Sequence, residues 1–155
     1  MAQITPQEGS SAQGMTPPPT YGFGVTIDAP FDEAVTRVTE ALKEEGFGIL
    51  TTIDVRQTLR DKLQVDFERY LILGACNPHL AHRALEAEHH IGLLLPCNVI
   101  VYEAHEVAPA KTPARTRIEI ADPIAMLSAA NQPALREIAD EAQERLQRVV
   151  ARLNP

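Results

Sequence analysis

The segment RYLILGACNPHLAHRALEAEHHIGLLLPCNVIVYEA, residues 69–104, contains the clearest strand and helix patterns of this protein. Its first seven residues are nearly all apolar, which is typical of a central strand that is covered on both faces. Asn77 and Pro78 then predict a helix start, because an asparagine N-cap followed by proline suits the first turn of a helix. We expect this helix to run to about His89 and to end at Gly92.

A second strand region follows in the same stretch, over residues 93–104. Pro96 interrupts it, and proline has no N–H to donate to a neighbouring strand. We therefore expect a bulge or an edge position at Pro96.

The flanking segments alternate between strand and helix patterns. Asp28 and Pro30 predict the start of a first helix, with a polar cap and proline in the first turn, and Gly46 predicts its left-handed end. Strands are expected over 21–27, 47–53 and 115–121, and helices over 55–63, briefly after Asp122, and over 132–153. The resulting order, β-α-β-α-β-α-β-β-α, lacks the regular alternation of a doubly wound fold. We predict an α+β fold, a curved and mainly antiparallel sheet of about five strands with helices packed on one face.

The composition sets the organisation of the chain. Its 155 residues are 45% hydrophobic and 23% charged, which suits one domain with its own core. Residues 1–20 hold Pro, Gln, Ser and Thr with almost nothing to bury. We therefore expect a disordered tail over 1–20 and a single domain over 21–155.

Charge and hydropathy limit the partners. The net charge is −7, and an acidic surface repels phosphate backbones, so no nucleic-acid partner is expected. No apolar stretch approaches the roughly 20 residues that span a bilayer, so no membrane partner is expected. The N-terminus lacks a signal-peptide pattern and two cysteines do not form a disulfide scaffold, so we expect a cytoplasmic protein with reduced thiols.

Two Cys-Asn dipeptides contain the only cysteines of the chain, Cys76-Asn77 and Cys97-Asn98. Proline follows the first pair and precedes the second. If both strands end on the same side of the sheet, the pairs face each other around a small pocket with two thiols and two amides. These four residues are the candidate ligand-binding site.

Cys76 is the candidate reactive thiol, with Cys97 as its partner. Cys76 lies just before a helix start, where free N–H groups and the helix dipole stabilise a thiolate and lower its pKa. Lys62 would steady an anionic ligand if it reached this pocket. The alternative is that both cysteines are buried small hydrophobes and Asn77 is only a cap, which is the more frequent arrangement. Capping explains Asn77 but not Asn98.

Histidines near Cys76 make a weak metal site. Cys76, His79 and His82 have a spacing that suits zinc or a softer metal, and Cys97 would have to complete the ligand set. A solvated helix face explains these histidines more simply. The chain has no phosphate loop, HExxH or CxxC motif, so no established catalytic set is present and an enzyme is not favoured.

Four segments resemble those of a known family: EEGFGILTTIDV, YLILGACNP, AHRALEAE and GLLLPCNVIVYE. Over roughly residues 21–153 the chain resembles the bacterial family catalogued as domain of unknown function 302. The resemblance implies a single α+β domain of the TATA-binding-protein-like class that is often dimeric, so a homodimer is expected. It implies no catalytic or binding residue and no cofactor, and fold alone does not imply DNA binding.

Three functions remain open from the sequence. The leading one is a small binding or sensor domain that holds a small molecule or a metal-bearing cofactor at the Cys-Asn pocket. The second is a thiol-dependent redox or sulfur-handling protein, with Cys76 attacking and Cys97 as partner. The third is an interaction module that uses the C-terminal helix or an unpaired sheet edge for its subunit contact.

Overall fold

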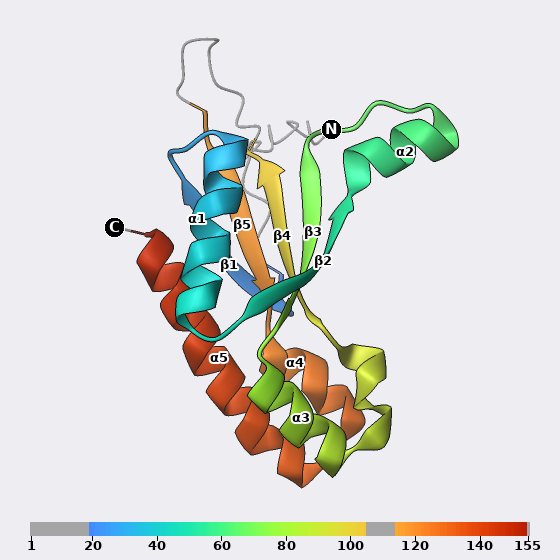
Figure 1. Cartoon of the computed structure of the whole chain (residues 1–155), viewed down its shortest axis with the longest axis vertical. Helices are drawn as coiled ribbons and strands as arrows, with labels where there is room; N and C mark the ends of the chain where they lie inside the picture. Colours follow the sequence, from blue (N-terminus) through green and yellow to red (C-terminus); the bar gives the residue numbers. More distant parts are fainter. Residues whose placement is uncertain (1–18, 105–113, 155) are drawn as a thin grey trace, which may run out of the picture.

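The computed structural model describes residues 19–104 and 114–154. It is an α+β domain with one five-stranded antiparallel sheet and helices packed on it (Figure 1). The predicted fold class is confirmed. The expected tail over 1–20 lies almost entirely outside the described residues.

The elements follow the predicted order, with two 3-10 helices inserted. In chain order they are β1 (Gly22–Ile27), α1 (Phe31–Glu44), β2 (Gly48–Asp54), α2 (Val55–Leu63), β3 (Tyr70–Cys76), α3 (Pro78–Ala87), the 3-10 helix η1 (His89–Leu94), β4 (Cys97–Glu103), β5 (Thr116–Ala121), α4 (Pro123–Leu127), the 3-10 helix η2 (Ser128–Ala130) and α5 (Pro133–Leu153).

The strands lie in the order β1-β5-β4-β3-β2, and each neighbouring pair is antiparallel. The register aligns Leu73 with Val99 and Val99 with Ile120, and all three side chains are buried. Because side chains alternate along a strand, these positions define a core face, on which α1 and α5 pack. α3, α4 and η1 gather at one end of the sheet (Figure 1).

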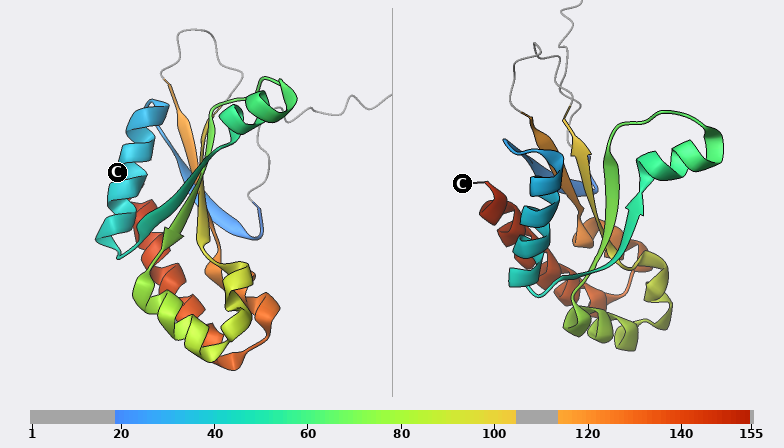
Figure 2. Two further views of the ribbon diagram at one scale, coloured as in Figure 1. Left: turned by 45° about the vertical axis from the view of Figure 1, so that its right-hand side comes forward. Right: turned by 45° about the horizontal axis from the view of Figure 1, so that its top comes forward.

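The opposite side of the sheet, which we call the open face, is not covered by any helix among the residues described. Tyr70 and Ile72 of β3 lie on this face and are only partly buried. The prediction that this strand is covered on both faces is therefore wrong for the single chain. Helix α2 also stands apart from the other helices and contains no buried residue (Figure 2).

The first helix ends as predicted but begins differently. Gly46 has a φ of +85°, and Phe47 and Gly46 donate backbone hydrogen bonds to Leu42 and Lys43, which forms a Schellman motif. At the start, Pro30 itself occupies the N-cap position, so no side chain caps the helix. The expected cap, Asp28, instead forms an ion pair with Arg115 at 3.2 Å.

The segment before β4 differs from the prediction. α3 ends at Ala87, and η1 follows, so Gly92 lies inside a 3-10 helix rather than at a helix end. β4 begins after Pro96, so this proline removes no sheet hydrogen bond and no bulge forms there. The irregularity in the sheet lies in β2 instead, between Ile49 and Thr51.

Helix α5 packs on the core through its apolar face. Its arginines also form ion pairs with Glu45, which lies at the end of α1. All of its large apolar side chains are at least partly buried. Glu141 and Arg145, four positions apart on α5, form an ion pair at 3.3 Å. Arg148 forms an ion pair with the buried Glu45 at the end of α1, at 3.0 Å.

Candidate functional site

The two Cys-Asn pairs lie beside each other where β3 ends and β4 begins. The register pairs Ala75 with Cys97 and Gly74 with Asn98. This adjacency follows from the antiparallel pairing, which brings the end of one strand next to the start of the other. The structure therefore brings together the four residues that the sequence suggests as a site.

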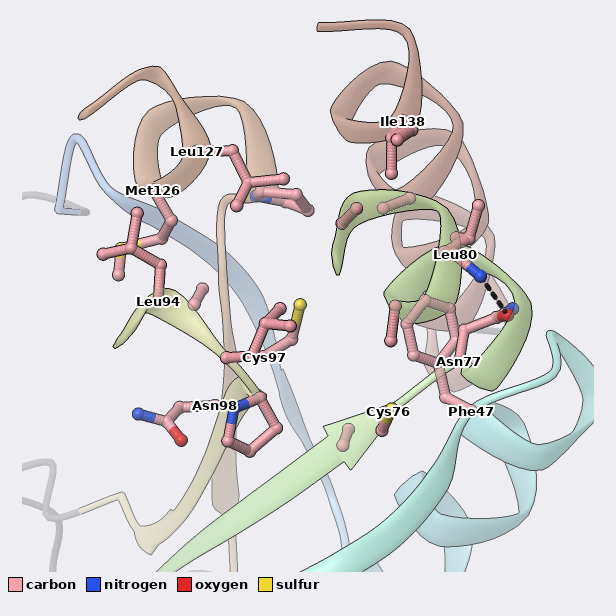
Figure 3. Close-up of a pocket in the computed structure, with 18 residues that line it drawn as sticks. Phe47, Cys76, Asn77, Leu80, Leu94, Cys97, Asn98, Met126, Leu127 and Ile138 are labelled. Carbon is pink, nitrogen blue, oxygen red and sulfur yellow. Dashed lines mark hydrogen bonds between the residues drawn. The ribbon is translucent and has the colours of Figure 1, made fainter. Parts of the chain in front are cut away.

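Their side chains do not face each other as two matched pairs. Cys97 lies on the core face, as do Val99 and Ala75, and it points toward the helices near Leu127 (Figure 3). Strand alternation sends Asn98 to the open face, where it is exposed. The same alternation separates Cys76 from Ala75, so the two thiols leave the sheet on different sides.

A hollow of about 60 Å³ lies at this end of the sheet, under α3, η1 and α4. All four candidate residues contribute to its lining, and the remainder is almost entirely apolar. The sequence did not identify these apolar residues as part of a site. They include Phe47, Leu80, Ala81, Ala84, Leu94, Leu127 and Ile138.

Met126 also lines the hollow, although its sequence pattern suggests a core residue. It is 36% exposed, so it lies at the rim of the hollow rather than in the core. Helix α4 holds it there, because Asp122 caps that helix by accepting hydrogen bonds from the backbone N–H groups of Ile124 and Ala125. The Asp-Pro start of α4 is visible in the sequence, but the position of Met126 depends on tertiary packing.

Asn77 has the structural role that its sequence context predicts. Its side-chain oxygen accepts a hydrogen bond from the backbone N–H of Leu80 at 3.2 Å, which caps α3 (Figure 3). The side chain is buried, and its amide nitrogen packs against Gly46 so closely that a Cβ at Gly46 would approach it to 2.9 Å. Asn77 therefore links the start of α3 to the end of α1.

Both thiols are less acidic than an ordinary cysteine. Burial raises the pKa of Cys97 to about 11, and the neighbouring Cys76 adds to this effect. Burial also raises the pKa of Cys76. The predicted lowering for Cys76 is wrong, because desolvation prevails and no basic side chain is among those lining the hollow. Both groups are protonated at neutral pH.

The weak metal candidates do not assemble. No group of three or more His, Cys, Asp and Glu side chains able to hold a metal exists within residues 19–104 and 114–154. His82 lies on the exposed side of α3, where its ring faces Glu86 at 3.4 Å. His79 is exposed as well, and neither histidine lines the hollow.

Lys62 also fails to reach the site. It is an exposed residue of α2, which projects from the far end of β2 (Figure 1). The Lys62 side chain is not among the residues that line the hollow.

A larger polar cleft of about 430 Å³ lies between α1, α2 and β3, and no sequence pattern indicates it. Arg56, Arg60 and Arg69 line it. Arg69 pairs with Asp32 at 2.6 Å, and Arg60 pairs with Asp66 at 2.9 Å. These acidic partners neutralise two of the three cations, so the cleft has no strong preference for anions.

The fold class and the family of the protein are both established. The antiparallel five-stranded sheet with helices over its core face makes it a small α+β domain. The family model described as Domain of unknown function DUF302 matches residues 23–153, and the chain belongs to this family. The resemblance seen in the sequence is confirmed.

A solved structure of the same family has the same fold. The crystal structure of an uncharacterized conserved DUF302 protein from Bacillus stearothermophilus is 32% identical to this chain, with a TM-score of 0.75. The match covers 88% of this chain and 100% of the other. No curated protein matches the chain. No helix in the described parts of the chain is long and apolar enough to cross a membrane.

Proposed function

We propose that this protein is a small-molecule-binding domain, and that its ligand places a small apolar group in the hollow at the Cys-Asn pairs. The hollow supports this proposal, because it combines an apolar lining with a few polar groups. Ligand sites in proteins have this composition, with apolar walls and a small number of polar groups that fix orientation.

The size of the hollow limits the apolar group. An engineered cavity of about 150 Å³ holds benzene, so a hollow of about 60 Å³ suits a group of only a few heavy atoms. The exposed amide of Asn98 lies at the rim and is available to a polar part of the ligand. The ligand class is therefore a small amphipathic molecule with a short aliphatic end.

Cys97 would contact the apolar end of that ligand. Its thiol is protonated at neutral pH because its pKa is about 11. A protonated thiol is a small, polarisable, largely apolar surface with a weak S–H donor. This chemistry suits binding of a neutral group and does not supply a nucleophile.

A thiol-dependent redox or sulfur-handling role is the alternative, with Cys76 attacking and Cys97 as partner. The adjacency of β3 and β4 favours it, because Cys76 follows Ala75, the direct neighbour of Cys97 across the strands. The raised pKa of both thiols weighs against it, since the thiolate is the attacking species. A metal-bearing cofactor has less support, because the candidate ligands do not form a group of three.

The compartment that we propose is the cytoplasm. Both cysteines are free, and neither forms a disulfide. Free, partly buried cysteines suit a reducing compartment.

Native mass spectrometry of the freshly purified full chain tests the binding proposal. We expect a bound mass that survives in Ala87→Leu and is lost in Ala81→Leu. Both substitutions add the same side chain to α3, but Ala81 lines the hollow whereas Ala87 is exposed. A bound mass that is unaffected by Ala81→Leu would show that the ligand binds elsewhere.

A further inference from the structure

The polar cleft between α1, α2 and β3 is a second cavity, separate from the hollow at Cys97. Leu71, near the start of β3, lines the cleft, whereas Ala75 and Cys76, at the end of that strand, line the hollow. Figure 1 shows α1 and α2 on either side of the sheet end that lies away from α3 and α4. At about 430 Å³, the cleft falls within the range of roughly 300–1,000 Å³ that is typical of small-molecule sites.

Arg69 is held in a fixed position in the wall of the cleft. Its guanidinium group lies over the ring of Phe31, 4.2 Å from the ring centroid, which is a cation–π contact. The same group donates a hydrogen bond to Asp32 at 2.6 Å and lies 3.9 Å from Glu103. Within the described part of the chain, its Nη1 group makes no hydrogen bond to protein. Arg69 therefore has N–H groups left for a ligand, and their direction is already set.

Arg56 lines the cleft from the first turn of α2. It is exposed, and it forms no ion pair with any residue that the structure describes. Its position at a helix start adds to its preference for a negative group, because the helix dipole is positive there. Arg56 is therefore the cation of the cleft that still lacks an acidic partner.

The two carboxylates of the cleft keep part of their accepting capacity. Asp32 binds Arg69 through Oδ1, and Asp54 accepts the N–H of Gln57 through Oδ1 at 2.9 Å. A carboxylate has two oxygens that accept hydrogen bonds. No hydrogen bond from a described residue reaches Oδ2 of either aspartate. The cleft thus offers free donors and free acceptors together, so it complements a ligand that carries both charges.

We propose that this cleft binds a small zwitterion, an amino acid or a dipeptide with an apolar side chain. The carboxylate of the ligand accepts hydrogen bonds from Arg56 and Arg69, and its ammonium group donates to Asp32. The apolar side chain packs on Val35 and Leu71, which also line the cleft. A ligand of a single charge satisfies only half of these groups and leaves the others without a partner.

NMR of the arginine Nε–Hε groups in the full chain tests this site, with L-leucine and glycyl-L-leucine as the probes. We expect at least one probe to shift the resonances of Arg56 and Arg69 in a saturable way, and the stronger of the two identifies the ligand as an amino acid or a dipeptide. Two matched compounds each keep one charge of leucine, 4-methylpentanoate and 3-methylbutylamine. Both should bind more weakly by about tenfold or more, because each loses hydrogen bonds to charged groups.

Arg56→Gln and Lys62→Gln form a matched pair of variants, read through the Arg69 resonance. Both remove one positive charge from an exposed position of α2, but Lys62 does not line the cleft. Arg56→Gln should weaken binding of the better probe by about tenfold or more, and Lys62→Gln should leave it unchanged. The proposal is overturned if neither probe gives a saturable shift or if 4-methylpentanoate binds as tightly as leucine. Unchanged binding in Arg56→Gln would overturn it as well.

Discussion

Ala75 and Cys97 are direct partners across β3 and β4, and both lie on the core face of the sheet. Ala75 is fully buried, whereas Cys97, at the first position of its strand, remains partly accessible. The difference arises because the helices that cover the sheet leave a hollow at this end. The thiol of Cys97 therefore belongs to a cavity wall rather than to the packed core.

Both thiols should react slowly with alkylating reagents at neutral pH. Because burial raises the pKa of both cysteines, alkylation by iodoacetamide at pH 7.5 should be slower at each than in the unfolded chain. The rate at Cys97 should keep rising with pH through pH 10, since its pKa is about 11. Peptide mass spectrometry resolves the two sites. A rate at Cys76 that is already maximal near pH 7 would instead favour the redox alternative.

Replacement by serine should lower the free energy of unfolding by different amounts at the two cysteines. Cys97→Ser should cost about 1–2 kcal/mol of unfolding free energy, because it places a hydroxyl on an apolar wall. Cys76→Ser should cost less than about 1 kcal/mol, because burial desolvates the Cys76 thiol less than that of Cys97. Urea unfolding measures both. Equal costs would mean that the two thiols share one environment.

The Asn77 side chain should contribute more to the free energy of unfolding than that of Asn98. Asn77→Ala removes the cap of α3 and should cost about 1–2 kcal/mol. Asn77→Asp keeps the accepting oxygen and should recover part of this loss. Asn98→Ala, on the exposed side, should change stability by less than about 0.5 kcal/mol. The same urea assay applies, and a larger loss for Asn98 than for Asn77 would contradict the assignment.

Much of this local structure follows from the sequence alone. The caps at Asp54 and Asn77 and the left-handed end at Gly46 depend on residues within a few positions of one another, and the structure contains all three. The core face of the last strand also follows from its alternation, with Ile118 and Ile120 buried.

The candidate site was only partly predictable. Antiparallel pairing implies that the Cys-Asn pairs are neighbours, but the face on which each side chain lies depends on register. The direction of the pKa shifts depends on burial, which comes from helices distant in sequence, such as α4 and α5. The same holds for Arg148, which bonds to Glu45, 103 positions away, rather than to a neighbour on its helix.

Glu45 makes stability depend on pH. Burial alone would raise its pKa, but hydrogen bonds and charge from Arg148 and Arg152 outweigh burial and hold the pKa below its ordinary value. The stabilisation is therefore complete above the unfolded pKa, about 4.3, and is lost as the pH falls through the lower folded pKa.

We expect Glu45→Gln to lower the free energy of unfolding by about 1–2 kcal/mol at pH 7. The loss of a fully buried ion pair would cost more, but both arginines here are half exposed. The difference in unfolding free energy between this variant and the wild type should become smaller below about pH 4. Urea unfolding from pH 3 to pH 7 measures it. A gap that stays constant over this range would show that the carboxylate charge contributes nothing.

The hollow beside Cys97 should accept an apolar guest. Xenon, which enters dry apolar cavities, is the most direct probe, and methyl NMR reports which side chains it touches. Saturating xenon should shift the methyl resonances of Leu80, Leu127 and Ile138 in the wild type and in Ala87→Leu, and should leave them unchanged in Ala81→Leu. Unshifted methyl resonances in the wild type, or equal shifts in Ala81→Leu, would contradict the claim.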